Sequence, residues 1–147
     1  MTHPYIDHLL KDHKKQRKLA KKLVKSETRE DKEKYRQELF VALYPHIMGE
    51  DASIFDYLQK KGDEARAGAL EAMQEHHVDR VLLGELMALD VDDEIFIPKA
   101  KVLREVNKHH LKEEEEEHFP RLEALASEEE LDTLFEAYEH AEHAVED

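Results

Sequence analysis

Residues 39–50 read LFVALYPHIMGE, which places His46 and Glu50 four residues apart within an apolar helical pattern. The segment HLKEE repeats this spacing with His110 and Glu114. Residues four apart on an α-helix lie on one face, with Cβ atoms roughly 5–6 Å apart. Each stretch therefore presents an imidazole and a carboxylate side by side toward a helical core. Two such faces turned toward each other could hold a pair of metal ions.

The composition favours long helices over strands. The 147 residues include only 4 Gly and 4 Pro, and 39% of them are charged, which is typical of helices joined by short connections. A chain of this length is expected to form one domain. We therefore predict an all-α protein with a single domain over residues 1–147.

Apolar residues at spacings of three and four predict four long helices and a shorter last one. They are expected over about residues 4–25, 28–61, 63–89, 98–120 and 127–145. Ser127 and Glu130 form a capping box at the start of the last helix, and Pro120 is expected to end the fourth. Short connections make consecutive helices antiparallel. We therefore predict an up-down-up-down four-helix bundle over about residues 4–120, followed by a short C-terminal helix.

Several classes of protein are excluded by what the sequence lacks. Without cysteine there is no disulfide, no thiolate metal site and no cysteine nucleophile, so any metal must be held by nitrogen and oxygen. No apolar run approaches the ~20 residues of a membrane span, and residues 1–10 lack the apolar core of a signal peptide. We expect a cytoplasmic protein that does not act at a membrane.

The charge is acidic overall but unevenly spread. The chain carries 22 Lys and Arg against 36 Asp and Glu, a net charge of −14. Such acidity argues against nucleic-acid binding, which depends on basic side chains that neutralise phosphates. The segment from Lys11 to Lys25 is the exception, with eight basic residues and one acid. We expect this basic helix to lie beside acidic neighbours, and contact with phosphates or an anionic surface is the alternative.

Residue counts place further histidines at the level of these motifs. The midpoint of His46 and Glu50 lies fourteen residues before Gly62, where two helices meet, and His76 lies fourteen residues after it. With a rise of ~1.5 Å per residue, these side chains sit at one height. His13 lies about as far from the start of its helix as Glu50 lies from the end of the next one. These helices, and the fourth within a turn or two, are therefore expected to present ligands at one level.

The resulting candidate site contains only imidazoles and carboxylates. Its members are His13, His46, Glu50, His76 or His77, His110 and Glu114. A Glu can bridge two metal ions ~3.5–4 Å apart, and imidazole and carboxylate donors without sulfur suit iron. Buried carboxylates without partners are too costly to be packing accidents. We therefore predict a two-metal site with positions open to water, hydroxide or a small gas molecule.

Four segments of the chain carry a family resemblance when they are taken in order. They are LLKDH at residues 9–13, HIMGED at 46–51, EHH at 75–77 with VLL at 81–83, and HHLKEEE at 109–115 continuing to Phe119-Pro120. Each segment alone is a weak signal, but together they cover nearly the whole chain. They resemble the hemerythrin-like, or HHE cation-binding, domain family.

The resemblance implies a four-helix bundle around a non-haem di-iron centre. Its cofactor would be two iron ions with a bridging oxo, hydroxo or water. Glu50 and Glu114 would be the bridging carboxylates, and His13, His46, His76 or His77, and His110 the terminal ligands. The family's oxygen carriers use two histidines one turn apart on the third helix, whereas Ala72 and Met73 stand at the corresponding positions here. This departure favours a site open to water, peroxide or nitric oxide, as in the family's stress-response branch.

The family pattern also bears on the third-helix ligand, because it places apolar residues seven and ten positions after it. Leu83 and Leu86 satisfy this pattern for His76 better than the corresponding residues do for His77, so His76 is preferred. The remaining histidines are expected at the surface or out of phase with the site: His3, His8, His109, His118, His140 and His143. In the acidic run 113–117 only Glu114 is in phase with His110, and the run is otherwise expected to be mostly a solvated face, with contact of Glu117 with the edge of the site as an alternative.

Three functions stay open on the sequence alone. The preferred one is a di-iron protein that binds, senses or reacts with oxygen, peroxide or nitric oxide, with this small ligand as its partner. The second is a protein that stores or delivers iron, and the third is a metal-free helical interaction module. The sequence identifies no catalytic acid or base outside the metal shell, so it does not indicate whether the protein is an enzyme.

Overall fold

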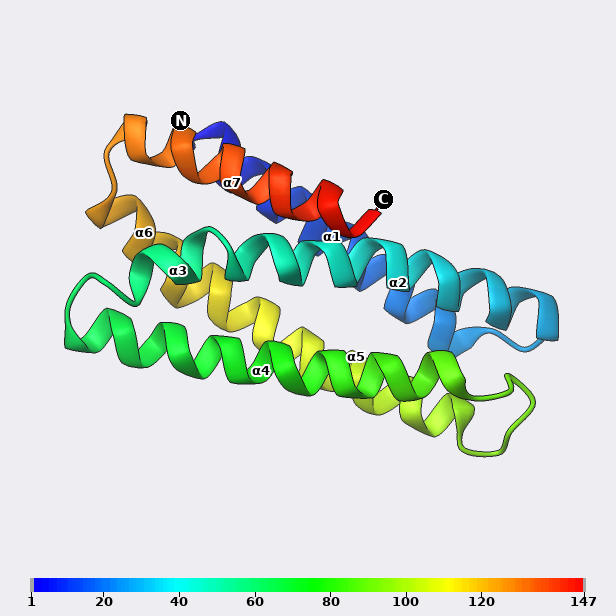
Figure 1. Cartoon of the computed structure of the whole chain (residues 1–147). Coiled ribbons are helices and arrows are strands. Elements are labelled where there is room, and N and C mark those ends of the chain that lie inside the picture. Colours follow the sequence, from blue (N-terminus) through cyan, green and yellow to red (C-terminus); the bar gives the residue numbers. More distant parts are fainter. Residues whose placement is uncertain (1, 147) are drawn as a thin grey trace.

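The computed structural model describes residues 2–146, and this part of the chain contains helices but no strand. The elements are α1 (Pro4–Lys25), α2 (Arg29–Asp51), α3 (Ile54–Leu58), α4 (Asp63–Ala88), α5 (Phe96–Glu113), the π-helical turn η1 (Glu114–His118), α6 (Phe119–Leu125) and α7 (Glu128–Glu146). Helices α1, α2, α4 and α5 lie side by side and alternate in direction along the chain (Figure 1), and each packs against two others of the four. The predicted all-α bundle is confirmed.

The last helix, α7, lies outside the bundle but packs along it. It begins with the predicted capping box, in which the Ser127 hydroxyl accepts from the Glu130 amide at 3.1 Å and the Glu130 carboxylate accepts from the Ser127 amide at 3.0 Å. From there it runs beside α2 and α1 (Figure 1). None of the helices within residues 2–146 is long and apolar enough to cross a membrane.

The prediction of one continuous helix over residues 28–61 is wrong, because the helix breaks between α2 and α3. Ser53 stands at the break with φ −125° and ψ −90°. Its hydroxyl donates to the Gly49 carbonyl at 2.7 Å and contacts the hydroxyl of Tyr5. A serine that bonds to the backbone in this way competes with helical hydrogen bonds. The break comes directly after the segment that carries Glu50, and it turns α3 into the core.

The prediction that the fourth helix ends at Pro120 is also wrong. The helical path starts earlier, at Phe96, passes through η1 and continues as α6 to Leu125. Pro120 falls within the first turn of α6, where its missing N–H is not needed. The wider turn just before it, of a kind often found at functional sites, begins at Glu114.

Two apolar clusters fill the bundle. One contains Tyr5, Phe55 and Phe119, and the other contains Leu19, Leu43 and Leu103. Buried polar side chains occupy the level between them, including all the preferred ligand candidates. The apolar clusters therefore hold a polar layer away from water on both sides.

Two histidines expected at the surface are buried instead. His3 caps α1, where its Nδ1 accepts from the Tyr5 amide at 2.9 Å, and His118 lies against the ring of Phe55 at 5.3 Å between centroids. His3 is 8% exposed and His118 is 4% exposed. Their burial depends on contacts with distant segments, which the local pattern does not contain. His109, His140 and His143 are exposed, as predicted.

A pair of glycines tests how closely α7 is packed. A Cβ on Gly49 would lie 2.6 Å from the ring of Tyr138, whereas a Cβ on Gly84 would meet nothing within 4 Å. We expect Gly49→Ala to lower the free energy of unfolding by about 1–3 kcal/mol through overpacking. The matched control Gly84→Ala should be neutral or stabilising by up to about 1 kcal/mol, because alanine favours the helix. Urea denaturation of both variants measures the difference, and equal values would contradict the close α2–α7 contact.

Candidate metal centre

Four helices bring the preferred ligand candidates together in the middle of the bundle. His13 comes from α1, His46 and Glu50 from α2, His76 from α4, His110 from α5 and Glu114 from the start of η1. None of these residues is more than 2% exposed. His77 instead lies on the exposed side of α4, because consecutive residues point about 100° apart around an α-helix. Of these two neighbouring histidines, His76 is therefore the one that lies with the other ligand candidates.

The six side chains form two overlapping groups of potential ligands. The first contains His13, His46, Glu50 and Glu114, and the second contains Glu50, His76, His110 and Glu114. Within each group the ligand atoms lie within 4.8 Å of one another. Glu50 and Glu114 belong to both groups, so each carboxylate can offer an oxygen to either side. This is the arrangement expected of two bridging carboxylates between two pairs of imidazoles.

Close approaches between nitrogen and oxygen atoms define the centre. His13 Nε2 lies 2.9 Å from a Glu114 oxygen, His76 Nε2 lies 3.1 Å from a Glu50 oxygen, and His46 Nε2 lies 3.2 Å from the other Glu50 oxygen. His110 Nε2 also contacts Glu114. Nε2 is thus the inward-facing atom of all four histidines.

Several of these atoms have no hydrogen-bond partner among the described residues. They are Nε2 of His13, His46 and His110, one oxygen of Glu50 and one of Glu114. Leaving a buried polar atom unpaired costs about 1–3 kcal/mol, and more when it is charged. Imidazole nitrogens and carboxylate oxygens converging without hydrogen-bond geometry are the donors that a divalent cation of borderline hardness takes. The residues present therefore fit a metal site.

The electrostatics of the centre also fit a metal site. Burial alone lowers the pKa of His46, but the charge of Glu50 and a hydrogen bond to Asp12 outweigh it and raise the pKa to about 9. Burial likewise disfavours the charged form of His110, and Glu114 raises its pKa to about 9. The carboxylates thus draw positive charge onto the imidazoles beside them. A bound cation would supply that charge and displace these protons.

The outer nitrogen of each histidine faces a carboxylate from the neighbouring helix. Asp12 of α1 faces His46, Asp51 of α2 faces His76, Glu75 of α4 faces His110, and Glu115 of η1 faces His13, with oxygens at 3.1, 2.6, 3.5 and 2.8 Å from the respective Nδ1 atoms. The pairs follow one another around the bundle, but only those of His13, His46 and His76 are hydrogen-bonded, and His110 Nδ1 has no hydrogen-bond partner among the described residues. A carboxylate hydrogen-bonded to Nδ1 keeps the proton there, so that the Nε2 lone pair points to the centre.

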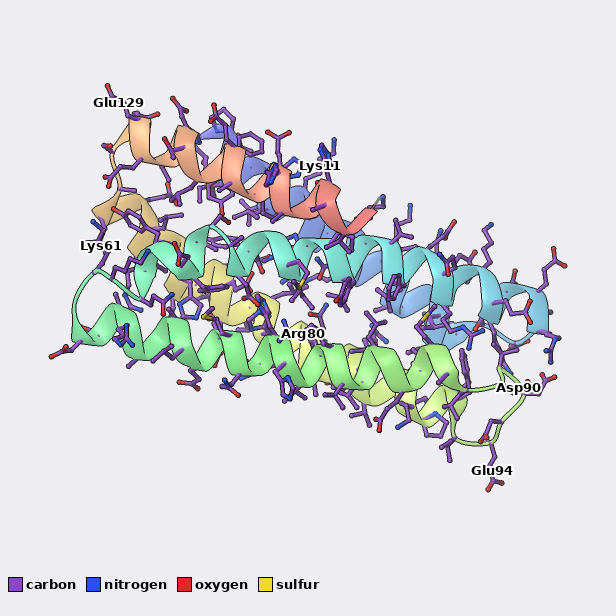
Figure 2. The ribbon with its side chains drawn as sticks, viewed as in Figure 1. Lys11, Lys61, Arg80, Asp90, Glu94 and Glu129 are labelled. Carbon is purple, nitrogen blue, oxygen red and sulfur yellow. The ribbon has the colours of Figure 1, made fainter. Side chains whose placement is uncertain are left out.

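Two carboxylates of this ring are themselves held by arginines. Arg80, labelled in Figure 2 between α2 and α4, donates to Asp51 at 3.2 Å. Arg17 of α1 donates to both oxygens of Glu115, at 2.8 and 3.0 Å. The two arginines therefore fix the carboxylates that orient His76 and His13.

A comparison with known protein families agrees with this geometry. The sequence matches the family model described as the hemerythrin HHE cation binding domain over residues 5–122. The chain belongs to this hemerythrin family. No match was found among curated proteins or among solved structures. The matched range contains all six side chains of the centre and ends before α7 begins.

Sequence reasoning missed the four carboxylates of the ring. The signal was present, because each of them is the chain neighbour of a preferred ligand candidate: Asp12-His13, Glu50-Asp51, Glu75-His76 and Glu114-Glu115. The expectation that Glu115 belongs to a solvated face is wrong. Neighbouring residues on a helix point in different directions, so the carboxylate beside each ligand candidate reaches the adjacent helix.

Helix α7 adds a contact from outside the range matched to the hemerythrin family. Tyr138 is fully buried, and its hydroxyl lies 2.6 Å from Asp12 and 2.8 Å from His46 Nδ1. The hydroxyl donates to the carboxylate and accepts from the imidazole. Asp12 therefore orients His46 both directly and through a tyrosine. Nothing in the spacing of α7 along the sequence indicated this role.

A second buried layer lies one helical turn from the centre. Asp79 follows His76 by three residues, is fully buried, and neither of its carboxylate oxygens has a partner among the described residues. Burial raises its pKa to about 7. On α1 and α5 the same layer contains Gln16 and Asn107, which are joined by a hydrogen bond of 3.1 Å. The polar interior thus extends beyond the ligand candidates.

Replacing Asp51 tests the ring of carboxylates. We expect Asp51→Asn to weaken metal binding by roughly 10–100-fold, because the neutral amide no longer fixes the tautomer and basicity of His76. The matched control is Asp56→Asn, a half-buried acid of α3 that bonds only to Gln59 and Lys60. Competition with a coloured chelator measures both affinities. Equal affinities for Asp51→Asn and the unmodified protein would contradict the orienting role.

Proposed function

We propose that this chain holds a pair of iron ions between Glu50 and Glu114 and uses them to bind, sense or react with oxygen, peroxide or nitric oxide. The observation that carries the proposal is the sharing of both carboxylates between the two groups of histidines. Nitrogen and oxygen donors without sulfur suit iron. Iron in this setting supplies one-electron redox chemistry and coordination positions for a small ligand.

The protein's own residues would orient the ions and restrict what reaches them. Each group of potential ligands offers two imidazoles and two shared carboxylates. On α4 the residue one turn before His76 is the fully buried Ala72, so this helix offers a single histidine to the centre. The smaller donor set favours open positions on the ions, and hence reaction or sensing over simple oxygen carriage.

Aromatic rings line the centre on the side of the first apolar cluster. Phe119 lies 5.3 Å from the His13 ring and Phe55 lies 5.4 Å from the His76 ring, between centroids. Because the ligand candidates are almost completely buried, only a molecule of a few atoms could approach them without opening the bundle. This favours a diatomic gas or peroxide over a larger substrate.

Metal content tests the bridging roles. We expect Glu50→Ala and Glu114→Ala to lower bound iron from about two ions per chain toward none, because each carboxylate serves both ions. His13→Ala should lower it only toward about one, since His13 belongs to a single group. The matched control Glu116→Ala, an exposed residue of the same acidic run, should keep full content. Iron analysis after anaerobic loading and desalting provides the measurement, and full content in both Glu variants would refute the bridging roles.

Anaerobic loading with Fe(II), followed by air and then peroxide, tests the function. A cation that binds only the folded chain at 100 times its Kd stabilises it by about 2.7 kcal/mol, which corresponds to a rise in Tm of roughly 5–10 °C for this length. Loss of peroxide with turnover would identify an enzyme, and a reversible change in visible absorption without turnover a sensor or carrier.

Two other results of this experiment would overturn the proposal. Rapid loss of the iron to a weak chelator, without any reaction, would favour iron storage or delivery. No bound iron and an unchanged Tm would leave a metal-free interaction module.

A further inference from the structure

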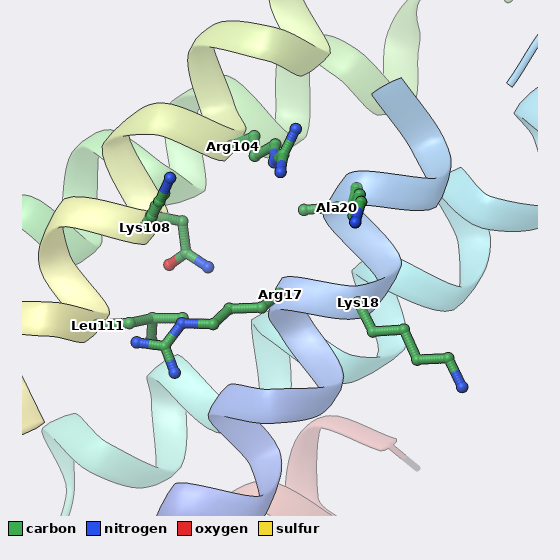
Figure 3. A pocket seen from close by; sticks show the side chains of 8 residues that line it. Arg17, Lys18, Ala20, Arg104, Lys108 and Leu111 are labelled. Atoms are coloured by element: carbon green, nitrogen blue, oxygen red, sulfur yellow. The ribbon is translucent and has the colours of Figure 1, made fainter. Parts of the chain in front are cut away.

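A pocket of about 360 Å³ opens between α1 and α5 (Figure 3). Five of the side chains that line it are basic: Arg17, Lys18 and Lys21 from α1, and Arg104 and Lys108 from α5. No acidic side chain is among the residues that line it. This concentration of positive charge is local, because the chain as a whole has a net charge of −14.

Most of these cations have no counter-charge of their own. Arg17 is paired with Glu115, but no carboxylate in the described part of the chain lies within 4.0 Å of the nitrogens of Lys18, Lys21, Arg104 or Lys108. The expectation that the basic first helix lies beside acidic neighbours is therefore wrong on this side. Like charges that face each other across two packed helices cost free energy, which an anion between them would offset.

The base of the pocket is polar and buried. Asn107 lines it and is only 4% exposed. One N–H of its amide donates to Gln16, which is itself fully buried and whose own nitrogen has no partner among the described residues. The pocket thus combines a cationic wall with a polar side chain at its base.

We propose that this pocket binds a small molecule through an oxyanion, either a phosphate or a set of carboxylates. In Figure 3 Arg104 and Lys108 extend from α5 beside the opening, Arg17 crosses toward Leu111, and Lys18 points away from the pocket. Arg104 supplies the planar donors that match an oxyanion in two-point contact, and Lys108 and Lys21 supply charge. The volume lies within the range of roughly 300–1,000 Å³ that small-molecule sites occupy.

The pocket is connected to the metal centre through Arg17. This side chain lines the pocket and also holds Glu115, which orients His13. An oxyanion in contact with Arg17 draws it from Glu115, and the carboxylate is then left to His13 alone. Binding in the pocket and binding at the centre are therefore coupled, and the coupling is equal in both directions. Occupancy of the pocket itself requires no metal, so it is independent of the function proposed above.

Calorimetric titration of the full chain with inorganic pyrophosphate and with citrate, at low ionic strength, tests the site. The double variant Arg104→Gln/Lys108→Gln should raise the Kd at least 10-fold, which corresponds to about 1.4 kcal/mol. The matched control is Lys101→Gln/Lys112→Gln, which removes the same charge from exposed positions of α5 that do not line the pocket. This control should change the Kd less than 2-fold.

Three results would overturn the proposal. They are the absence of binding to either probe, an equal loss of affinity in the control variant, and binding only to vesicles that contain an anionic phospholipid. An equal loss in the control would mean attraction to net charge, and vesicle binding alone would mean a membrane surface. The titration is repeated after loading with Fe(II), and a shift in the Kd that disappears in Arg17→Gln supports the connection to the centre.

Discussion

Two carboxylates facing each other inside an apolar bundle are the constraint on which this structure depends. Glu50 and Glu114 are at most 1% exposed and lie between two apolar clusters. Like charges in such a place are strongly unfavourable unless positive charge lies between or beside them. The histidines, the carboxylates behind them and the burial of the whole layer all serve that requirement. Metal binding and the stability of the fold are thus linked through the same side chains.

The ring of carboxylates makes the four helices depend on one another. Each helix delivers a ligand candidate to the centre and also an acid that orients the histidine of the next helix. Asp12, Asp51 and Glu115 are hydrogen-bonded to their histidines, and Glu75 lies 3.5 Å from His110 Nδ1. Any three helices would leave one histidine without its orienting carboxylate. The site is therefore a property of the assembled bundle and not of a pair of motifs.

The sequence predicted the parts of the fold and the site that follow from helical repetition. Counting residues from Gly62 placed His46 and His76 at one level, and the structure has them in two groups that share Glu50 and Glu114. The breaks at Ser53 and Glu114 depend on side-chain hydrogen bonds and on the π turn, which periodicity does not reveal. The contact of Tyr138 with His46 joins residues 92 apart in the chain, and no local pattern reports it.

The π turn at residues 114–118 has a consequence for how this chain can vary. It holds one more residue than an α-helical turn would, and the wider turn accommodates this residue so that Phe119 keeps its phase. Removing it would give an ordinary α-helical turn and leave Pro120 in a helix interior, where proline removes a backbone hydrogen bond. The acidic run 113–117 would be expected to tolerate substitution, because all of its residues are glutamates and several are exposed. Its composition can vary, but the loss of one residue would place Pro120 where its missing N–H is needed.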